Sequence, residues 1–206
     1  MSFFTTDRIG FPMVTLDSLP VDVHLLPMTK RHFELFLAEP NVLDDDWYLN
    51  VLSLNPRARR AEEAGSERHF ITGILPGEAI SFARWLGNEY RLPTVHEWQE
   101  ILHRFGHLRG LPDRFLRSLH ESPARSFGLE RLLANRPGPL THVSRMLGGV
   151  MEWSRGTRGW RLMGQPRPRF ARQLYSSQLP VTPIDPDKRH QLNGFRLVRD
   201  RRPHVP

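Results

Sequence analysis

The chain has 206 residues, 39% hydrophobic and 25% charged, with a net charge of +7 at pH 7 and no cysteine. This composition is typical of a soluble globular protein, and the length fits one large domain or two small ones. Because cysteine is absent, disulfide bonds, thiolate metal sites and cysteine nucleophiles are excluded. No apolar run approaches the about 18 residues of a membrane span, and the N-terminus lacks the pattern of a signal peptide. We therefore expect a cytoplasmic protein with no membrane partner.

The charge is unevenly distributed along the chain. Residues 1–103 hold nine basic and fifteen acidic side chains, whereas residues 104–206 hold twenty basic and seven acidic ones. Of the basic residues, 27 are arginine and 2 are lysine. Arginine suits planar contacts with carboxylate and phosphate, so an acidic protein or a nucleic acid is the partner that this charge favours. A simple compositional bias towards arginine explains the same numbers.

Two segments in the first half have the pattern of helices that face a core. TKRHFELFLAE (29–39) begins at a candidate N-cap, Thr29, and places its apolar residues on one face. Residues 77–86 follow Pro76 and repeat apolar residues at positions i, i+3, i+4 and i+7. Gly87 then suits a left-handed helix end. The intervening HFITGI (69–74) is typical of a short strand or extended lead-in.

The segment LPTVHEWQE (92–100) predicts the start of a third helix. Thr94 and Glu97 are spaced as a capping box, in which each side chain accepts from the other residue's backbone N–H. Apolar residues then recur at helical spacing, and we expect the helix to end at Gly106. This apolar stripe consists of Trp98, Ile101, Leu102 and Phe105. The pattern indicates a core-facing structural helix.

The opposite face of this helix carries polar residues that resemble a metal site. His96, Glu100, His103 and His107 lie within about 60° of one another around the axis. Imidazole and carboxylate groups in such a stripe are ligands for divalent metals. HEWQE nevertheless lacks the second histidine of the zinc-protease motif HExxH, because Glu100 occupies its place. The stripe also lies opposite the apolar face, so we favour a solvated surface and expect no bound metal.

The second half has a weaker pattern. Residues 127–134 favour a short helix. Beyond residue 148, the pieces VMEW, GWRLMG and GFRLV alternate with glycine and proline, which predicts short strands in an irregular, loop-rich region.

Six motifs in order give the chain a resemblance to a known family. RLPTVHEW (91–98) resembles the Arg-Leu-Pro-Thr-x-x-Glu-Trp signature of the formylglycine-generating enzyme, or sulfatase-modifying factor, domain. LPMTKRHFELFL (26–37), GEAISFARWLG (77–87), GGVMEW (148–153), GWRLMGQ (159–165) and GFRLVR (194–199) are similar to that family's other motifs. The resemblance implies one α+β domain over residues 1–206, with its core at about 10–200 and a C-type-lectin-like fold. We expect three helices plus short, irregular strands.

The departures from the family pattern bear on activity. Formylglycine-generating enzymes hold copper with a cysteine pair, and this chain has none. A related branch, the ergothioneine-pathway sulfoxide synthases, takes its iron-binding histidines largely from an additional helical domain that this chain has no room for. The family's calcium-ligating asparagine is replaced by Gly149, so one calcium site is in question and we expect no cofactor. Glu152 and Trp153 resemble the family's core anchor, and Arg196 resembles the arginine of its closing strand, where a buried carboxylate would pair with it.

The leading functional hypothesis is a non-catalytic binding or adaptor module that binds a protein partner. In its more specific form, the hypothesis takes this partner to be acidic. The binding surface would lie between the Glu-Trp motif and the closing strand. Arginine and aromatic residues, the types enriched at binding hot spots, are frequent there. The candidate residues are Arg155, Arg158, Trp160, Arg167, Arg169, Arg172 and Tyr175.

Two alternatives remain open from the sequence. One is a cysteine-free, metal-dependent oxidase or oxygenase of the same superfamily that uses histidines and carboxylates. The other is nucleic-acid binding through the basic half, which would weaken steeply with salt. No basic stripe with regularly interleaved aromatics is present, so we rank nucleic acid below a protein partner. We expect the chain not to be an enzyme.

Overall fold

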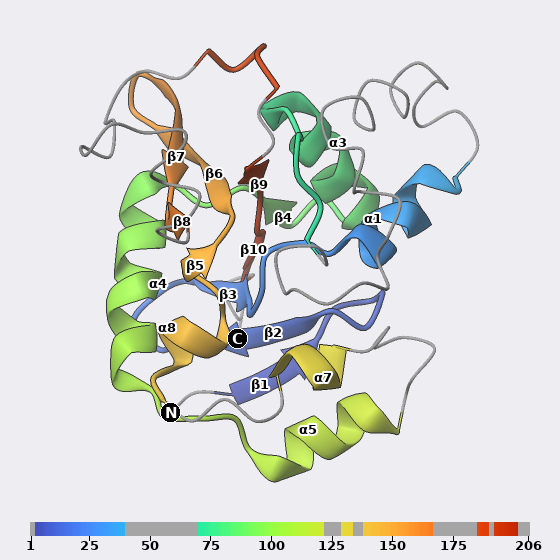
Figure 1. Cartoon of the computed structure of the whole chain (residues 1–206), viewed down its shortest axis with the longest axis vertical. Helices are drawn as coiled ribbons and strands as arrows, with labels where there is room; N and C mark the ends of the chain where they lie inside the picture. Colours follow the sequence, from blue (N-terminus) through green and yellow to red (C-terminus); the bar gives the residue numbers. More distant parts are fainter. Residues whose placement is uncertain are drawn as a thin grey trace, which may run out of the picture.

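The two ends of the described chain meet in one antiparallel sheet. The computed structural model describes residues 3–39, 70–121, 129–133, 138–166, 185–189 and 192–201. The sheet has the order β1 (Phe3–Thr6), β2 (Pro12–Thr15), β3 (Val21–His24), β10 (Val198–Asp200) and β4 (Tyr90–Arg91). The closing strand β10 therefore lies between β3 and β4 and is antiparallel to both (Figure 1).

The second half of the chain forms two smaller sheets. Strand β6 (Met151–Gly156) pairs in antiparallel fashion with β7 (Gly159–Met163) and in parallel with β9 (Asn193–Gly194). Strand β5 (Leu147–Gly149) pairs in parallel with β8 (Gln165–Pro166). The short strands predicted in VMEW and GWRLMG are thus present. The GFRLV segment instead divides between the end of β9 and the start of β10. In HFITGI, Phe70 makes only an isolated bridge with Thr29.

Helices α1 (Lys30–Leu37) and α3 (Pro76–Leu86) pack together on an aromatic core. Thr29 caps α1 as expected, and the rings of Phe33 and Phe82 stack with 5.3 Å between their centroids. Gly87 ends α3 as predicted and has a positive φ, but its φ of 155° and ψ of 153° lie outside the left-handed helical region. A positive φ of this size is one that L side chains rarely adopt, so this position still favours glycine.

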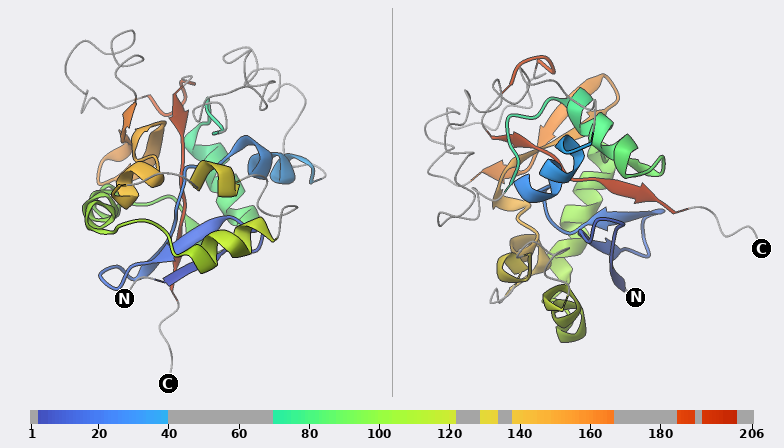
Figure 2. Two further views of the ribbon diagram at one scale, coloured as in Figure 1. Left: turned by 60° about the horizontal axis from the view of Figure 1, so that its bottom comes forward. Right: turned by 90° about the vertical axis from the view of Figure 1, so that its right-hand side faces the viewer.

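Helix α4 (Val95–His107) packs against α8 (Leu140–Val143) and β6 (Figure 2). Its apolar stripe is buried at Trp98, Ile101 and Phe105. The prediction that Gly106 ends this helix is wrong. The residue does not take a positive φ, so the helix continues to His107 and reaches its C-cap at Leu108.

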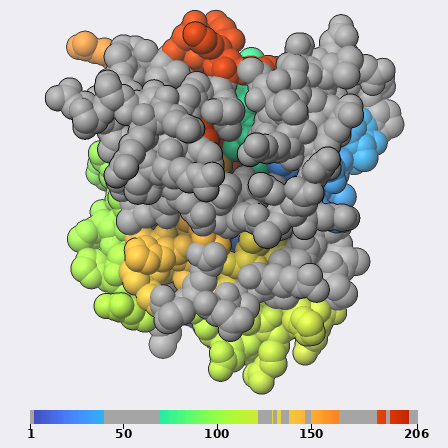
Figure 3. All heavy atoms as spheres, in the orientation of Figure 1, coloured from blue at the N-terminus to red at the C-terminus, as the bar shows by residue number. Residues whose placement is uncertain are grey.

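The described residues contain more helices than the three expected. Helix α7 (Leu129–Leu133) lies inside the predicted segment 127–134. Helices α5 (Asp113–His120) and α8 were not predicted. Helix α5 buries Phe115 and Leu119 and packs against α7 below β1 (Figures 1 and 3). No helix in the described segments has the length and apolar character needed to cross a membrane.

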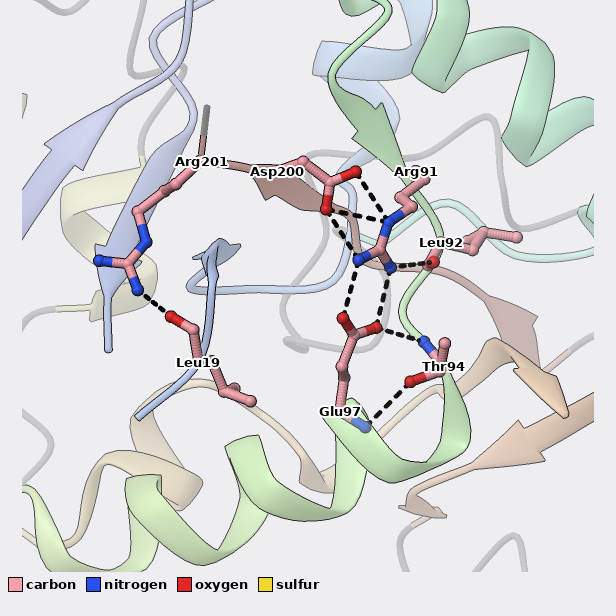
Figure 4. Close-up of polar contacts among 7 residues, drawn as sticks. All are labelled: Leu19, Arg91, Leu92, Thr94, Glu97, Asp200 and Arg201. Atoms are coloured by element: carbon pink, nitrogen blue, oxygen red, sulfur yellow. Dashed lines mark hydrogen bonds and ion pairs between the residues drawn. The ribbon is translucent and has the colours of Figure 1, made fainter. Parts of the chain in front are cut away.

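The start of α4 is tied to the end of β10 by a shared arginine (Figure 4). The Glu97 carboxylate accepts hydrogen bonds from the Thr94 N–H at 2.8 Å and from Arg91 Nη1 and Nη2, both at 2.8 Å. On its other side, Arg91 donates to Asp200 at 2.8–3.1 Å. The capping box predicted from the sequence is therefore one half of a longer chain of charges that joins α4 to the sheet. Arg201, which follows β10, donates to the Leu19 carbonyl.

Candidate binding pocket

A pocket of about 330 Å³ opens at the first turn of α3. Three segments that are distant in the sequence build it: the start of α3, strand β7 and the segment 185–189. The lining residues are Leu75, Pro76, Gly77, Glu78 and Ser81 on the helix side, and Trp160, Pro186 and Asp187 opposite. Two prolines, a leucine and an indole ring give the pocket its apolar lining, and Glu78, Ser81 and Asp187 give it polar groups.

An ion pair fixes the relative position of two of these segments. Glu78 accepts from the Leu75 N–H at 2.8 Å and from Arg189 Nη1 at 2.7 Å. Arg189 Nη1 also donates to the Gly73 carbonyl at 2.8 Å. The pair is largely buried, with 18% of the Arg189 side chain and 11% of the Glu78 side chain exposed. Glu78 is therefore a structural part of the wall, because its oxygens are already engaged.

The opposite wall belongs to the hairpin of β6 and β7. Arg155 and Trp160 are direct cross-strand partners, so their side chains leave the hairpin on the same face. The Arg155 backbone N–H donates to the Pro93 carbonyl at 2.8 Å, which docks the hairpin beside the start of α4. At its tip, Gly159 has a φ of 114°, a conformation that L side chains rarely adopt.

The two elements that face each other across the pocket carry exposed charges of opposite sign. Arg155 and Arg158 are exposed on the hairpin, while Trp160 is half-buried between hairpin and pocket. On the opposite side, Asp187 is exposed and its backbone N–H donates to Asp185 Oδ1 at 2.9 Å. The hairpin that carries Trp160 is therefore basic and exposed, whereas Asp187 lines the other side of the pocket.

The pocket does not assemble a nucleophile. Of the described lining residues, only Ser81 carries a hydroxyl, which donates to the Gly77 carbonyl at 3.1 Å within the helix. No histidine is among these lining residues. The chemistry that these groups offer is recognition of an apolar side chain flanked by charge.

The structure brings together three of the seven predicted binding residues. Arg155 and Trp160 lie on the two strands of the β6–β7 hairpin, and Arg158 lies in the turn between them. The other four predicted residues, Arg167, Arg169, Arg172 and Tyr175, lie outside the described residues. The sequence analysis missed the α3 wall and Asp187. The only local signal at Asp187 is the DPD turn pattern (185–187), which does not reveal a pocket.

The residues considered for metal binding lie along the outer face of α4. His96, His103 and His107 are exposed, and Glu100 forms an ion pair with Arg104 at 2.7 Å. In the described part of the chain, no three histidine or carboxylate side chains gather into a group that could hold a metal ion. Gly149, which replaces the family's calcium-ligating asparagine, ends β5.

The three residues expected to be structural in the second half are fully buried. Glu152 and Trp153 lie on β6, and Arg196 lies between β9 and β10. Arg196 Nε donates to Glu152 Oε2 at 2.7 Å, and Trp153 Nε1 donates to the Ile74 carbonyl at 2.6 Å. Because Ile74 directly precedes the α3 wall, this hydrogen bond of Trp153 connects β6 to the start of α3.

Residues 5–106 match the protein family described as the sulfatase-modifying factor enzyme 1-like domain. Over this segment, just under half of the 206 residues, the chain is similar to that family. The match covers strands β1–β4 with helices α1, α3 and α4, so the α3 wall of the pocket lies within the sulfatase-modifying factor region. The hairpin and Asp187 come from the part of the chain beyond it. No curated protein matches the chain.

Proposed function

We propose that this protein, which is similar to the sulfatase-modifying factor enzyme 1-like domain over residues 5–106, is a non-catalytic binding module for a protein partner with an acidic docking segment. The single observation that carries the proposal is the pocket that Trp160 shares with α3, on the hairpin that also carries the exposed Arg155 and Arg158. An anchor side chain of the partner would enter the pocket. Neighbouring carboxylates of the partner would face the two arginines.

The size and chemistry of the pocket support this proposal. Its volume of about 330 Å³ is at the lower end of small-ligand sites, and suits one or two side chains. Tryptophan and arginine dominate binding hot spots because they combine large apolar area with directed hydrogen bonds. Walls of proline and a capped helix start lose little conformational freedom on binding.

The absence of cysteine from all 206 residues supports a role other than that of the formylglycine-generating enzymes. Copper(I) selects soft thiolate ligands, so that chemistry has no ligands in this chain. A cysteine-free metal oxidase would need a cluster of histidines and carboxylates, and the described residues contain none. Nucleic acid is the remaining alternative for the basic hairpin.

Selection of displayed random peptides on the immobilised protein tests the proposal. We expect wild type at physiological salt to enrich peptides that combine acidic residues with an apolar anchor. R155E/R158E should bind the enriched peptides about tenfold or more weakly, as should W160A, because hot-spot truncations cost at least this much. The matched control is R114E/R117E, which makes the same charge change at two exposed arginines of α5.

Equal binding by R155E/R158E and its control would refute the assignment. Thermal unfolding of W160A verifies that it remains folded, since Trp160 is half-buried. Oligonucleotides serve as the second probe. Binding that falls steeply with salt and is lost in R155E/R158E would establish the nucleic-acid alternative in place of a protein partner.

A further inference from the structure

The pocket at the start of α3 has a negatively charged interior. Its described lining residues include two carboxylates, those of Glu78 and Asp187, and no arginine, lysine or histidine. The exposed arginines of the hairpin, Arg155 and Arg158, are not among these lining residues. The basic hairpin surface and the pocket interior therefore favour groups of opposite charge on one ligand.

Of the two lining carboxylates, that of Asp187 is the one available to a ligand. Both oxygens of Glu78 accept hydrogen bonds from Arg189, which compensates the glutamate charge. The Asp187 carboxylate makes no hydrogen bond or ion pair within the described part of the chain, and its backbone N–H donates to Asp185. Lys188, which follows Asp187, is exposed and is not among the lining residues. Asp187 therefore gives the pocket its uncompensated negative charge.

The geometry points to a pocket that takes a lysine or arginine side chain of the partner's docking segment. This inference rests on the proposed function and narrows the anchor to a side chain with an apolar stem and a cationic tip. The stem would contact Leu75, Pro76 and Pro186, because such stems bury along apolar surface while the charge stays near water. The tip would meet the Asp187 carboxylate. The half-buried ring of Trp160 offers a cation–π contact, for which tryptophan is the best aromatic side chain.

Two capped peptides that differ in one charged group test the inference on the full-length protein. The first is acetyl-DEKED-amide, and the second has norleucine in place of the lysine, which keeps the apolar stem and removes the ammonium group. Chemical-shift titration of the Trp160 indole N–H, assigned with W160F, measures both affinities. We expect wild type to bind the lysine peptide about threefold or more tightly, because exposed ion pairs and cation–π contacts each contribute modestly. Non-specific attraction to this basic chain favours the opposite order, since the norleucine peptide is more negative.

The substitution D187N should remove the preference for lysine, and it should bind the norleucine peptide no more weakly than wild type does. It leaves the hydrogen bond to Asp185 in place, because Asp187 makes that bond with its backbone N–H. The matched control is D113N, which makes the same charge change at an exposed aspartate of α5 and should keep the preference for lysine.

The outcomes separate this inference from the proposed function. Equal affinity of the two peptides for wild type, or an unchanged preference for lysine in D187N, would overturn the inference and leave the proposed function standing. The proposed function fails instead if R155E/R158E binds both peptides as tightly as wild type does. If neither peptide shifts the Trp160 signal at millimolar concentration, both are overturned.

Discussion

Arg196 uses all of its side-chain N–H groups inside the core. Nε and Nη2 donate to Glu152 at 2.7 and 2.8 Å, and Nη2 also donates to the Ser144 carbonyl at 2.9 Å. Nη1 reaches the His24 and Leu25 carbonyls at 3.0 and 3.1 Å. One guanidinium therefore joins the five-stranded sheet, the turn after α8 and strand β6. Both charged side chains of the pair are fully buried, so each depends on the other for solvation.

Replacement of Glu152 by glutamine should strongly destabilise the protein. The variant keeps the size of the side chain and leaves Arg196 as a buried charge without its counter-charge. Breaking one partner of a buried pair costs about 3–5 kcal/mol. Urea unfolding at pH 7 measures the difference. The control is R104Q, which breaks the exposed ion pair of Arg104 with Glu100. It should change the free energy of unfolding by less than about 1 kcal/mol. Equal effects of the two substitutions would contradict this account.

At the scale of a single helix, the capping box at the start of α4 makes a pH-dependent contribution to the stability of the protein. Burial alone would raise the pKa of Glu97, but hydrogen bonds from Arg91 and from the Thr94 backbone outweigh it, so the pKa lies below its ordinary value of 4.5. A lowered pKa in the folded state stabilises the protein above pH 4.5. That stabilisation is lost as the pH falls through the folded-state pKa.

Glu97→Gln isolates this contribution, because glutamine retains the capping hydrogen bond and cannot ionise. We expect E97Q to be less stable than wild type at pH 7, and the two to converge as the pH falls below 4.5. Thermal unfolding from pH 3 to 7 measures the gap. T94A serves as the comparison, since loss of an N-cap costs about 0.5–2 kcal/mol without changing a charge. A gap between E97Q and wild type that persists at pH 3 would argue against an ionised Glu97 as its source.

Helices with a long apolar period and the short strands of VMEW and GWRLMG were predictable from the sequence, whereas strands β1–β3 and helices α5 and α8 were not. The stripe of Trp98, Ile101 and Phe105 spans two turns and specifies a buried face. Strand β3 alternates valine with Asp22 and His24, but all four positions are buried, and four residues are too few for a period of two to be distinguished from chance. Helix α8 is only four residues long, too short for periodicity to show. The prediction that α4 ends at Gly106 failed because a glycine inside a helix costs only about 1 kcal/mol relative to alanine, which does not stop the helix from reaching His107.

The candidate pocket depends on the whole molecule in a way that local patterns do not encode. Its walls come from residues 75–81, from Trp160 and from residues 186–187. Trp160 was predictable as an aromatic residue beside arginines. Its position opposite α3 follows from long-range contacts, such as the hydrogen bond of Trp153 to Ile74 and that of Arg189 to Glu78.

The closing strand should decide whether the molecule folds at all. Strand β10 lies between β3 and β4, and Arg199 pairs with Asp22 at 2.5 Å across 177 residues of sequence. Removal of β10 would expose two inner strand edges and the Glu152 charge together. We expect a chain that ends at residue 184 to lack a cooperative thermal transition, and the separate peptide 185–206, added in trans, to restore it. A truncated chain that unfolds cooperatively by itself would show that the first sheet is stable without its last strand. Recovery with the wild-type peptide but not with an R196M peptide would place the requirement on the buried ion pair, whereas equal recovery would place it on the strand backbone.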